Sequence, residues 1–300
     1  MGQLENMQLF VKITELGSIT KTADHLNIAK SAVSRRLTEL EANLGVKLIQ
    51  RTTRKSHLTE AGKLYLRKCQ MLISEIEELN NQLVSETKSL SGNLKIAVPL
   101  SFGIMHLMPA IDVFLNEHEQ LKLDIHFSDR KVDMIEEGFD LAFRIGNLED
   151  SSFKARNITQ IKHTLCASAD YLKHHGHPKT LRELKRHKLL QYSDIPSAGF
   201  NLISPDGQSH IVNMESRYRS NNGDFLKYMA LSNHGITLLP TFITGEQIKS
   251  GKLINILPDY QIATMHAYAL YPNSQYLPQK VRMLIDFLIE KFGDTPYWDK

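Results

Sequence analysis

The spacing of apolar positions in the first 29 residues predicts two short helices. The first helix carries one apolar stripe at helical spacing, formed by Leu4, Met7, Phe10 and Val11. Gly17 interrupts this pattern, and the hydroxyl of Ser18 or Thr20 can cap the second helix. The second helix ends near Asn27 and carries the apolar residues Ile19, Ala23 and Leu26.

A third helix, predicted from about Lys30 to Asn43, separates an apolar face from a polar one. Its apolar positions step by four, three and four and face the core: Val33, Leu37, Leu40 and Leu44. The opposite face is basic and has short side chains, and it consists of Lys30, Ser31, Ser34, Arg35 and Thr38. Such a face can enter a major groove, where hydroxyls meet phosphates or base edges and arginine reaches guanine. Together with the preceding helix, it forms a helix-turn-helix pattern that ends at Gly45.

A hairpin is predicted directly after this helix, with strands over residues 46–51 and 54–58. Leu48 and Leu58 would anchor the hairpin, while Arg51, Arg54 and Lys55 lie around its tip. A basic loop beside a recognition helix is suited to hold the flanking phosphates, as the wing of a winged helix does.

Thr59 can cap a long helix that runs to about Lys88. Its apolar positions alternate in steps of four and three, which is the 3.5-residue period of a coiled coil. These positions are the candidate dimerisation residues: Tyr65, Cys69, Leu72, Ile76, Leu79 and Leu83. The alternative is that the helix packs only on its own domain, but the sustained alternation favours a seam between two chains.

After the turn at residues 91–93, short apolar runs alternate with helical stretches. Strands are predicted over 94–99, 121–128, 139–146, 164–168, 235–239 and 267–271. Helices are predicted near 103–118, 130–137, 224–233, 241–249 and 278–292, the last with Val281, Leu284, Ile285 and Leu288 facing inward. This alternation predicts a parallel α/β sheet with ligands at the carboxyl ends of its strands.

The charge of the chain is concentrated in one segment. The formal net charge of the whole chain is only +3, but residues 30–58 hold seven basic and two acidic residues, a local charge of +5. The seven are Lys30, Arg35, Arg36, Lys47, Arg51, Arg54 and Lys55. An ordinary solvated surface could carry the same excess of basic residues. The charge therefore indicates nucleic-acid binding only together with the helix-turn-helix pattern.

Length and composition indicate an ordinary cytoplasmic protein. Three hundred residues suggest roughly two domains, and 42% hydrophobic with 23% charged residues is typical of soluble proteins. Two cysteines, Cys69 and Cys166, form no disulfide framework and fit a reducing compartment. We find no secretory signal and no stretch near the roughly 18 apolar residues of a membrane span, so we expect no membrane partner.

Dense motifs over about residues 4–62 resemble those of the LysR-type transcriptional regulators. Residues 18–23 resemble the start of the second helix in that family, and residues 29–37, with Leu40 and Glu41, resemble its recognition helix. Residues 44–54 and 58–62 match its wing and the start of its linker helix. More diffuse similarity to the sensor domain of the family continues along the chain, at Phe143–Gly146, Ser220–Asn222, Gly235–Pro240 and Gly251–Leu253.

The resemblance implies a multi-domain chain: an all-α/winged helix-turn-helix domain, a long linker helix, and a two-lobed α/β domain similar to type 2 periplasmic binding proteins. The expected boundaries are 1–62 for the DNA-binding domain, 60–89 for the linker and dimerisation helix, and 92–300 for the effector-binding domain. Lobe I would comprise 92–162 and 267–300, and lobe II 163–266, with the effector in the cleft between them.

Two positions depart from the pattern of the family. Ala29 stands where the family often has a serine or threonine that caps the recognition helix; Ser31 is a possible substitute. The family often has a tryptophan near Phe200, whereas the single tryptophan here is Trp298.

The candidate DNA-binding residues follow from the basic face and the wing. Lys30, Ser31, Ser34 and Arg35 would enter the groove, and Arg51 and Arg54 would clamp phosphates or a minor groove. Thr20 adds a phosphate contact at a helix N-terminus. Arg36 is expected to point toward the protein, so we interpret its role as structural and not as DNA binding.

The candidate effector-binding residues lie where predicted strands end or helices begin: Ser101, Ser128, Arg144, Asn221 and Asn222. The helix start after Ser101 favours an anion. The alternative roles are helix caps, turn residues and an arginine in a structural ion pair.

Neither a metal site, a cofactor nor a catalytic centre is expected. The group His174, His175 and His177, with His163 and His187, lacks cysteine partners and regular spacing, so we interpret it as a solvated loop. Cys166 is expected to be buried and inert. Signatures of hydrolases, nucleotide-binding loops and zinc proteases are missing from the sequence.

The predicted function is a bacterial regulator that binds imperfect palindromes in double-stranded DNA and responds to a small-molecule effector, with an anion favoured. The resemblance implies a homodimer that assembles into a homotetramer, a nucleoid-associated place in the cytoplasm, and RNA polymerase as a further partner. The alternatives are a stand-alone solute-binding protein, which predicts a signal peptide and no basic wing, and an enzyme with an appended DNA-binding domain.

Overall fold

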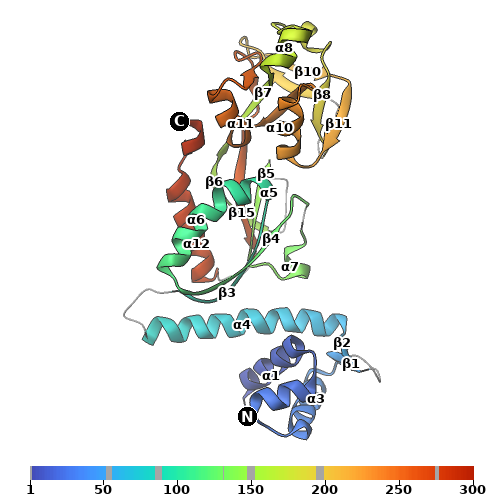
Figure 1. Ribbon diagram of the computed structural model, residues 1–300. Helices are drawn as coiled ribbons and strands as arrows, with labels where there is room; N and C mark the ends of the chain where they lie inside the picture. The colour runs from blue at the N-terminus through green and yellow to red at the C-terminus, as the bar shows by residue number, and fades with distance from the viewer. Residues whose placement is uncertain are drawn as a thin grey trace. The chain divides into compact units, whose positions relative to one another are not determined.

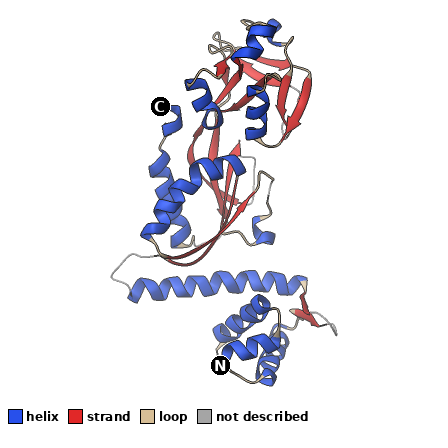
Figure 2. Cartoon of the chain, in the orientation of Figure 1, coloured by secondary structure: helices blue, strands red, loops and turns tan. Residues whose placement is uncertain are grey.

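The computed structural model describes residues 2–51, 56–84, 90–130, 132–146, 153–193, 199–273 and 277–300. The chain divides into two compact units, Met1–Gly92 and Asn93–Lys300. Figure 1 labels the elements along the chain, and Figure 2 shows that helices dominate the first unit while the second mixes helices and strands.

The described part of the first unit contains helices α1 (Gln3–Leu16), α2 (Ile19–Leu26), α3 (Lys30–Leu44) and α4 (Glu60–Val84), and the strands β1 (Ile49–Arg51) and β2 (Ser56–Leu58). The predicted helices and the hairpin are thus confirmed, with shorter strands than expected. The strands pair antiparallel, from Ile49 opposite Leu58 to Arg51 opposite Ser56. The tip of the hairpin, with Arg54 and Lys55, lies outside the described residues.

Local chemistry explains where these helices begin and end. The Ser18 hydroxyl accepts a hydrogen bond from the Lys21 amide, which confirms Ser18 as the cap of α2. Gly17 and Gly45 end α1 and α3 with φ of 65° and 70°, a left-handed conformation that favours glycine. The Thr59 hydroxyl accepts from the Gly62 amide and caps α4 as predicted.

The core of the first unit joins all three short helices to the base of the hairpin. It consists of Leu9, Phe10, Ile13, Ala23, Val33, Leu37, Leu40, Leu48 and Ile49. The inward placement of Leu44 is wrong: its side chain is 39% exposed, because α3 ends there and the chain turns away at Gly45. The buried face of α1 is also turned from the predicted stripe, toward Leu9 and Ile13.

The second unit contains a five-stranded sheet in the order β4-β3-β5-β15-β6. Its strands are β3 (Ser91–Val98), β4 (Gln120–Phe127), β5 (Leu141–Gly146), β6 (Phe153–Ile161) and β15 (Met265–Pro272). The chain between β3 and β4 forms α5 (Leu100–Phe102), a π-helical turn (Gly103–Leu107) and α6 (Met108–Glu117). Helix α7 (Met134–Glu137) precedes β5, and α12 (Gln279–Phe292) packs beside α6 and β6 (Figure 1).

A second five-stranded sheet has the order β11-β8-β12-β7-β13. Its strands are β7 (His163–Ser168), β8 (Leu189–Tyr192), β11 (Ser216–Ser220), β12 (Ile236–Pro240) and β13 (Leu253–Asn255). The helices among them are α8 (Ala169–His175), α9 (Leu181–Leu184), α10 (Gly223–Leu231) and α11 (Thr241–Lys249). A small sheet adds β9 (Gly199–Ile203), β10 (Ser209–Asn213) and β14 (Gln261–Ile262), and the 3-10 turn Tyr297–Asp299 follows α12.

The predicted purely parallel sheet is wrong, because both large sheets are mixed. β3 runs parallel to β5, and β8 runs parallel to β11 and β12. β15 is antiparallel to both β5 and β6, and β7 is antiparallel to β12. The cause is the path of the chain: β6 leads into β7 of the other sheet through Lys162, and β15 brings the chain back, so the two crossing segments run in opposite directions.

The six predicted strands and the five predicted helix regions are all present, with α7 shorter than expected. The inward face of α12 is confirmed, since Val281, Leu284, Ile285 and Leu288 are fully buried. Sequence patterns missed β6, the short strands β8 to β11, β13 and β14, and helices α8 and α9. Phe200 belongs to the hydrophobic core that packs against the second five-stranded sheet, together with Leu165, Leu189, Leu202 and Ile236.

Candidate functional site

The polar face of α3 lies on the surface of the first unit. Lys30, Ser31, Arg35 and Thr38 are exposed and Ser34 is half-buried, while Val33 and Leu37 on the opposite side are buried. Arg35 keeps 75% of its side chain exposed and, within the described part of the chain, pairs with Glu39 alone, at a long 3.6 Å between Nε and Oε1. The guanidinium is therefore available to a partner, because an exposed pair at this distance holds it weakly.

The N-terminus of α3 begins at Ala29, whose backbone is extended and whose side chain gives no capping bond. Ser31 lies exposed in the first turn of α3, and its role as a substitute for the missing cap stays a prediction. An uncapped helix N-terminus presents amide groups and the positive end of the helix dipole, which favour a phosphate. Thr20 lies exposed in the first turn of α2.

The wing is described only at its base. Arg51 is the last residue of β1, and Arg54 lies outside the described residues. The first unit therefore leaves Thr20 of α2 and Lys30, Ser31 and Arg35 of α3 exposed, with Ser34 half-buried, and the DNA-binding role of these residues and of the wing tip stays a prediction.

The predicted seam residues on α4 differ in exposure. Tyr65 contacts the Phe10 ring of α1, with 5.5 Å between centroids, and is partly buried, while Cys69 is fully buried. The role of these two residues in pairing with a second chain stays a prediction. Leu72 is 43% exposed and Ile76 is partly exposed, while the side chains of Leu79 and Leu83 lie outside the described residues.

In the second unit, Ser101 lies in α5 directly after β3, and its side chain is buried. Its hydroxyl donates a 2.6 Å hydrogen bond to Oδ2 of Asp224, which lies in the first turn of α10 beside the other large sheet. Lys227 holds the other carboxylate oxygen at 2.9 Å. Burial disfavours the charged carboxylate, but the bonds from Ser101 and Lys227 together lower the pKa of Asp224.

Sequence reasoning missed Asp224 and Lys227. The one local signal for these two residues is their position in the helix that Asn222 caps. That signal is weak, because a carboxylate in the first turn of a helix often serves only to stabilise the helix dipole. Asn222 accepts a hydrogen bond from the Phe225 amide at 2.9 Å and is therefore used as a cap. Asn221 is exposed beside it.

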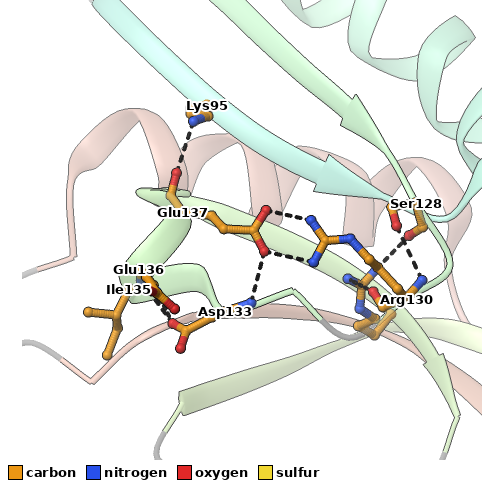
Figure 3. A network of polar contacts seen from close by, with 8 residues as sticks. Lys95, Ser128, Arg130, Asp133, Ile135, Glu136 and Glu137 are labelled. Carbon is orange, nitrogen blue, oxygen red and sulfur yellow. Dashed lines mark hydrogen bonds and ion pairs between the residues drawn. The ribbon is translucent and has the colours of Figure 1, made fainter.

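Ser128 and Arg144 belong to a network that fixes the loop after β4. Arg144 donates to the carbonyl oxygens of Ser128 at 3.0 Å and Arg130 at 2.6 Å, and the Ser128 hydroxyl accepts from the Arg130 amide. Arg130 in turn makes a two-pronged ion pair with Glu137, which also accepts from the Asp133 amide (Figure 3). Among the described residues, Arg144 thus donates to backbone carbonyls and holds the loop after β4 in place.

These contacts bring three of the five predicted effector residues to one edge of the first sheet. Asp129, next to Ser128, accepts from the Leu100 amide, and Leu100 precedes Ser101. The two asparagines lie at the start of α10, which carries Asp224 toward Ser101. A separate pocket beside the second sheet is lined by His163, Thr164 and Asn255, among others, and includes no predicted effector residue.

The histidine-rich segment is exposed as predicted; it begins in a helix, and His177 lies in the loop that follows. His174 and His175 form the last turn of α8, and the His175 ring stacks on Tyr171 with 4.3 Å between centroids. Within the described part of the chain, no three His, Cys, Asp or Glu side chains are placed to share a metal ion. Cys166 is buried in β7, and burial raises its thiol pKa to about 12, so it is inert as predicted.

Family models match both parts of the chain. Residues 4–63 match the bacterial regulatory helix-turn-helix protein, lysR family, and residues 87–293 match the LysR substrate binding domain. A stand-alone solute-binding protein has no counterpart to the first match, so that alternative is not favoured. These families are regulators of transcription and not enzymes. None of the helices among the described residues is long and apolar enough to cross a membrane.

Relatives are similar over nearly the whole chain. An uncharacterised HTH-type transcriptional regulator of Haemophilus influenzae is 37% identical over 94% of this chain and 98% of its own length. The HTH-type transcriptional activator AaeR of Escherichia coli (strain K12) is 32% identical over 98% and 96%. The solved structure of CrgA, a LysR-type transcriptional regulator from Neisseria meningitidis, aligns with a TM-score of 0.62 at 29% identity, covering 97% of this chain and 99% of that one. This chain belongs to the LysR family of bacterial transcriptional regulators.

Proposed function

We propose that the protein reads its operator with the polar face of α3. Lys30, Ser31, Ser34 and Arg35 enter the major groove, Thr20 contacts a phosphate, and Arg51 and Arg54 of the wing hold the flanking backbone. The observation that carries this proposal is the exposed Arg35 guanidinium on the side of α3 opposite the buried Val33 and Leu37. The domain boundaries proposed are 1–62, 60–89 and 92–300, with lobes split near residues 162 and 266.

The test compares two neighbouring arginines on the same helix. Arg35→Ala lowers the affinity for an operator duplex by about 1–3 kcal/mol, because it removes a base contact. Arg36→Ala removes the same charge from another face of α3 and weakens binding less. Fluorescence anisotropy with a duplex that the purified protein selects from a random pool measures both. Equal losses for the two variants contradict the proposed placement of the groove-facing side.

We further propose that two chains pair through the exposed part of α4, so that two recognition helices read the half-sites of an imperfect palindrome. A homotetramer would contact two such operators. The protein would act in the cytoplasm, at the nucleoid, and RNA polymerase is the proposed further partner.

The effector proposal concerns the place where the two sheets of the second unit meet, at Ser101 and α10. Ser101 and Lys227 supply a hydroxyl and an ammonium group, and the Asp224 carboxylate binds both. An effector with a carboxylate or phosphate can offer the same two groups an equivalent partner, so it would compete with Asp224. Binding of such an anion would change the contact between the lobes and thereby shift the equilibrium between two regulator states.

Thermal shift with a panel of small carboxylates and their uncharged amides tests this proposal. An effector stabilises the wild-type protein in proportion to its concentration. Ser101→Ala weakens the response to the acid, whereas Ser250→Ala, an exposed serine on the end of α11, does not. A hit whose amide binds as well as the acid contradicts the proposed anion.

A further inference from the structure

The turn between the recognition helix α3 and strand β1 is held by a single buried carboxylate. Glu41, in the last turns of α3, is only 6% exposed. Its Oε1 accepts hydrogen bonds from the amides of Leu48 at 3.0 Å and Ile49 at 3.1 Å, and Oε2 pairs with Lys47 Nζ at 2.7 Å. The backbone carbonyl of Glu41 accepts from the Val46 amide at 3.2 Å. One residue of the helix therefore binds all four residues of the turn, 46–49.

The same turn is held from the other side by the start of α4. The Thr59 hydroxyl donates to the Lys47 carbonyl at 2.6 Å, and the Thr59 amide donates to the Leu48 carbonyl at 3.0 Å. Gly62 lies so close to the Leu48 carbonyl oxygen that a Cβ at this position would overlap it. Residues 47–49 are thus clamped between α3 and α4, an arrangement that we call the wing junction: Glu41, residues 46–49, Thr59 and Gly62.

The position of Glu41 is electrostatically unfavourable without these partners. Burial disfavours a charged carboxylate, and the C-terminal part of a helix carries the negative end of its dipole. The bonds from Lys47, Ile49 and Leu48 outweigh the burial, and the pKa of Glu41 is lowered. Charge-assisted hydrogen bonds of this kind are stronger than neutral ones. Lys47 keeps 71% of its side chain exposed, so the two backbone amides are the buried part of the contact.

The consequence for DNA binding follows from what the junction connects. Helix α3 carries Ser34 and Arg35, and β1 begins at Ile49 and ends at Arg51. A recognition helix and a wing bind the same duplex only if their relative orientation places the helix in the groove and the wing on the flanking backbone at the same time. We infer that Glu41 is a positioning residue for DNA binding, whose carboxylate fixes strand β1 relative to α3 so that both contact one operator. This inference rests on the proposed function.

The experiment uses the full chain and the duplex that the wild-type protein selects from a random-sequence pool. Glu41→Gln is compared with Glu15→Gln, which changes an exposed carboxylate of α1 that pairs with Lys12. Both substitutions raise the net charge by one, and charge alone would strengthen binding to DNA. The measurements are affinity by anisotropy as a function of salt, hydroxyl-radical footprints, and the melting temperature of each variant.

We expect Glu41→Gln to bind the selected duplex about tenfold more weakly, since two buried amides lose their charged acceptor. The slope of log affinity against log salt becomes shallower by about one to two, the contribution of one or two basic wing residues. The footprint loses its flanking protections and keeps the central ones made by α3. Glu15→Gln retains wild-type affinity, slope and footprint.

Two outcomes overturn the inference. In the first, Glu41→Gln binds and protects DNA as Glu15→Gln does. In the second, central and flanking protections fall together, in proportion to the fraction of unfolded protein in the melting curve, which assigns Glu41 to stability alone. Failure of the proposed function is distinguishable from both, because the wild-type protein would then select no duplex, or Arg35→Ala would bind as well as Arg36→Ala.

Discussion

The Ser101 hydroxyl donates a 2.6 Å hydrogen bond to the Asp224 carboxylate across 123 positions of sequence. Ser101 follows the first strand of one large sheet, and Asp224 lies in the first turn of a helix that packs on the other. The bond therefore joins the two halves of the second unit.

Removing this bond is expected to loosen the two halves. Ser101→Ala leaves a half-buried carboxylate with one donor fewer, which costs about 1–2 kcal/mol. Hydrogen exchange, measured by mass spectrometry, should increase at the amides of residues 100–107 and 223–231. Ser250→Ala, whose hydroxyl donates only to the nearby Gln247 carbonyl, is the control. Unchanged exchange in Ser101→Ala would show that other contacts hold the halves together.

The different exposure of the predicted seam residues on α4 leads us to expect different defects for two of them. Leu72→Glu places a charge on an exposed surface, so it weakens dimerisation and leaves the fold of the monomer intact. Cys69→Ser places a hydroxyl in the covered face and lowers the stability of the first unit by about 1–3 kcal/mol. Sedimentation equilibrium and thermal melting separate the two effects. A Leu72→Glu variant that remains as dimeric as wild type argues against α4 as the pairing surface.

The structure also predicts a pH dependence from His163. Burial lowers the pKa of His163 from 6.5 to about 4, so the folded protein keeps this ring neutral where the unfolded chain would protonate it. The resulting stability is complete above pH 6.5 and is lost as the pH falls toward 4, by roughly 2 kcal/mol at pH 5. His163→Gln should therefore flatten the fall in melting temperature between pH 7 and pH 5. His174→Gln, at an exposed ring, should preserve it; equal slopes for wild type and His163→Gln would contradict the assignment.

Gly62 provides a direct test of the wing junction. Replacing glycine by alanine inside a helix normally stabilises it by about 0.5–1 kcal/mol. Gly62→Ala should instead destabilise the first unit by about 1–3 kcal/mol, because its methyl group would overlap the Leu48 carbonyl oxygen. Gly2→Ala, where nothing lies within 4 Å, serves as the control. If Gly62→Ala is as stable as Gly2→Ala, α4 can move away from residues 46–49 with little loss of stability, which contradicts a tight wing junction.

Local patterns in the sequence were sufficient for most elements and for the polar face of α3. Periodicity finds a helix and its apolar face, and Ser18, Gly45 and Thr59 mark helix ends through chemistry that acts within a few residues. The same periodicity could not tell which partner covers a face. Tyr65 fits a coiled-coil seam as well as a contact with its own domain, and its contact with Phe10 of α1 is visible only in the fold.

The effector residues show the second limit of sequence reasoning. The position of Ser101 after a strand marks it as a candidate, but Asp224 is bound to it from 123 positions away, a relationship that no local pattern encodes. The position of Arg144 near a strand end marks it in the same way, but its use in holding the Ser128 and Arg130 carbonyls depends on a loop geometry found only in three dimensions. The sequence shows Glu41 as part of a motif, whereas its role in the turn follows only from its contacts.

Selection of DNA from a random-sequence pool by the whole chain, with wild type and Arg35→Ala compared, tests most sharply whether α3 reads the operator. We expect wild type to enrich two half-sites of opposite orientation, with centres separated by about one or more helical turns of 10–10.5 base pairs, and Arg35→Ala to lose the preference at one base pair of each half-site. Enrichment of the same sequence by both proteins, or no enrichment by wild type, would overturn the proposed role of α3.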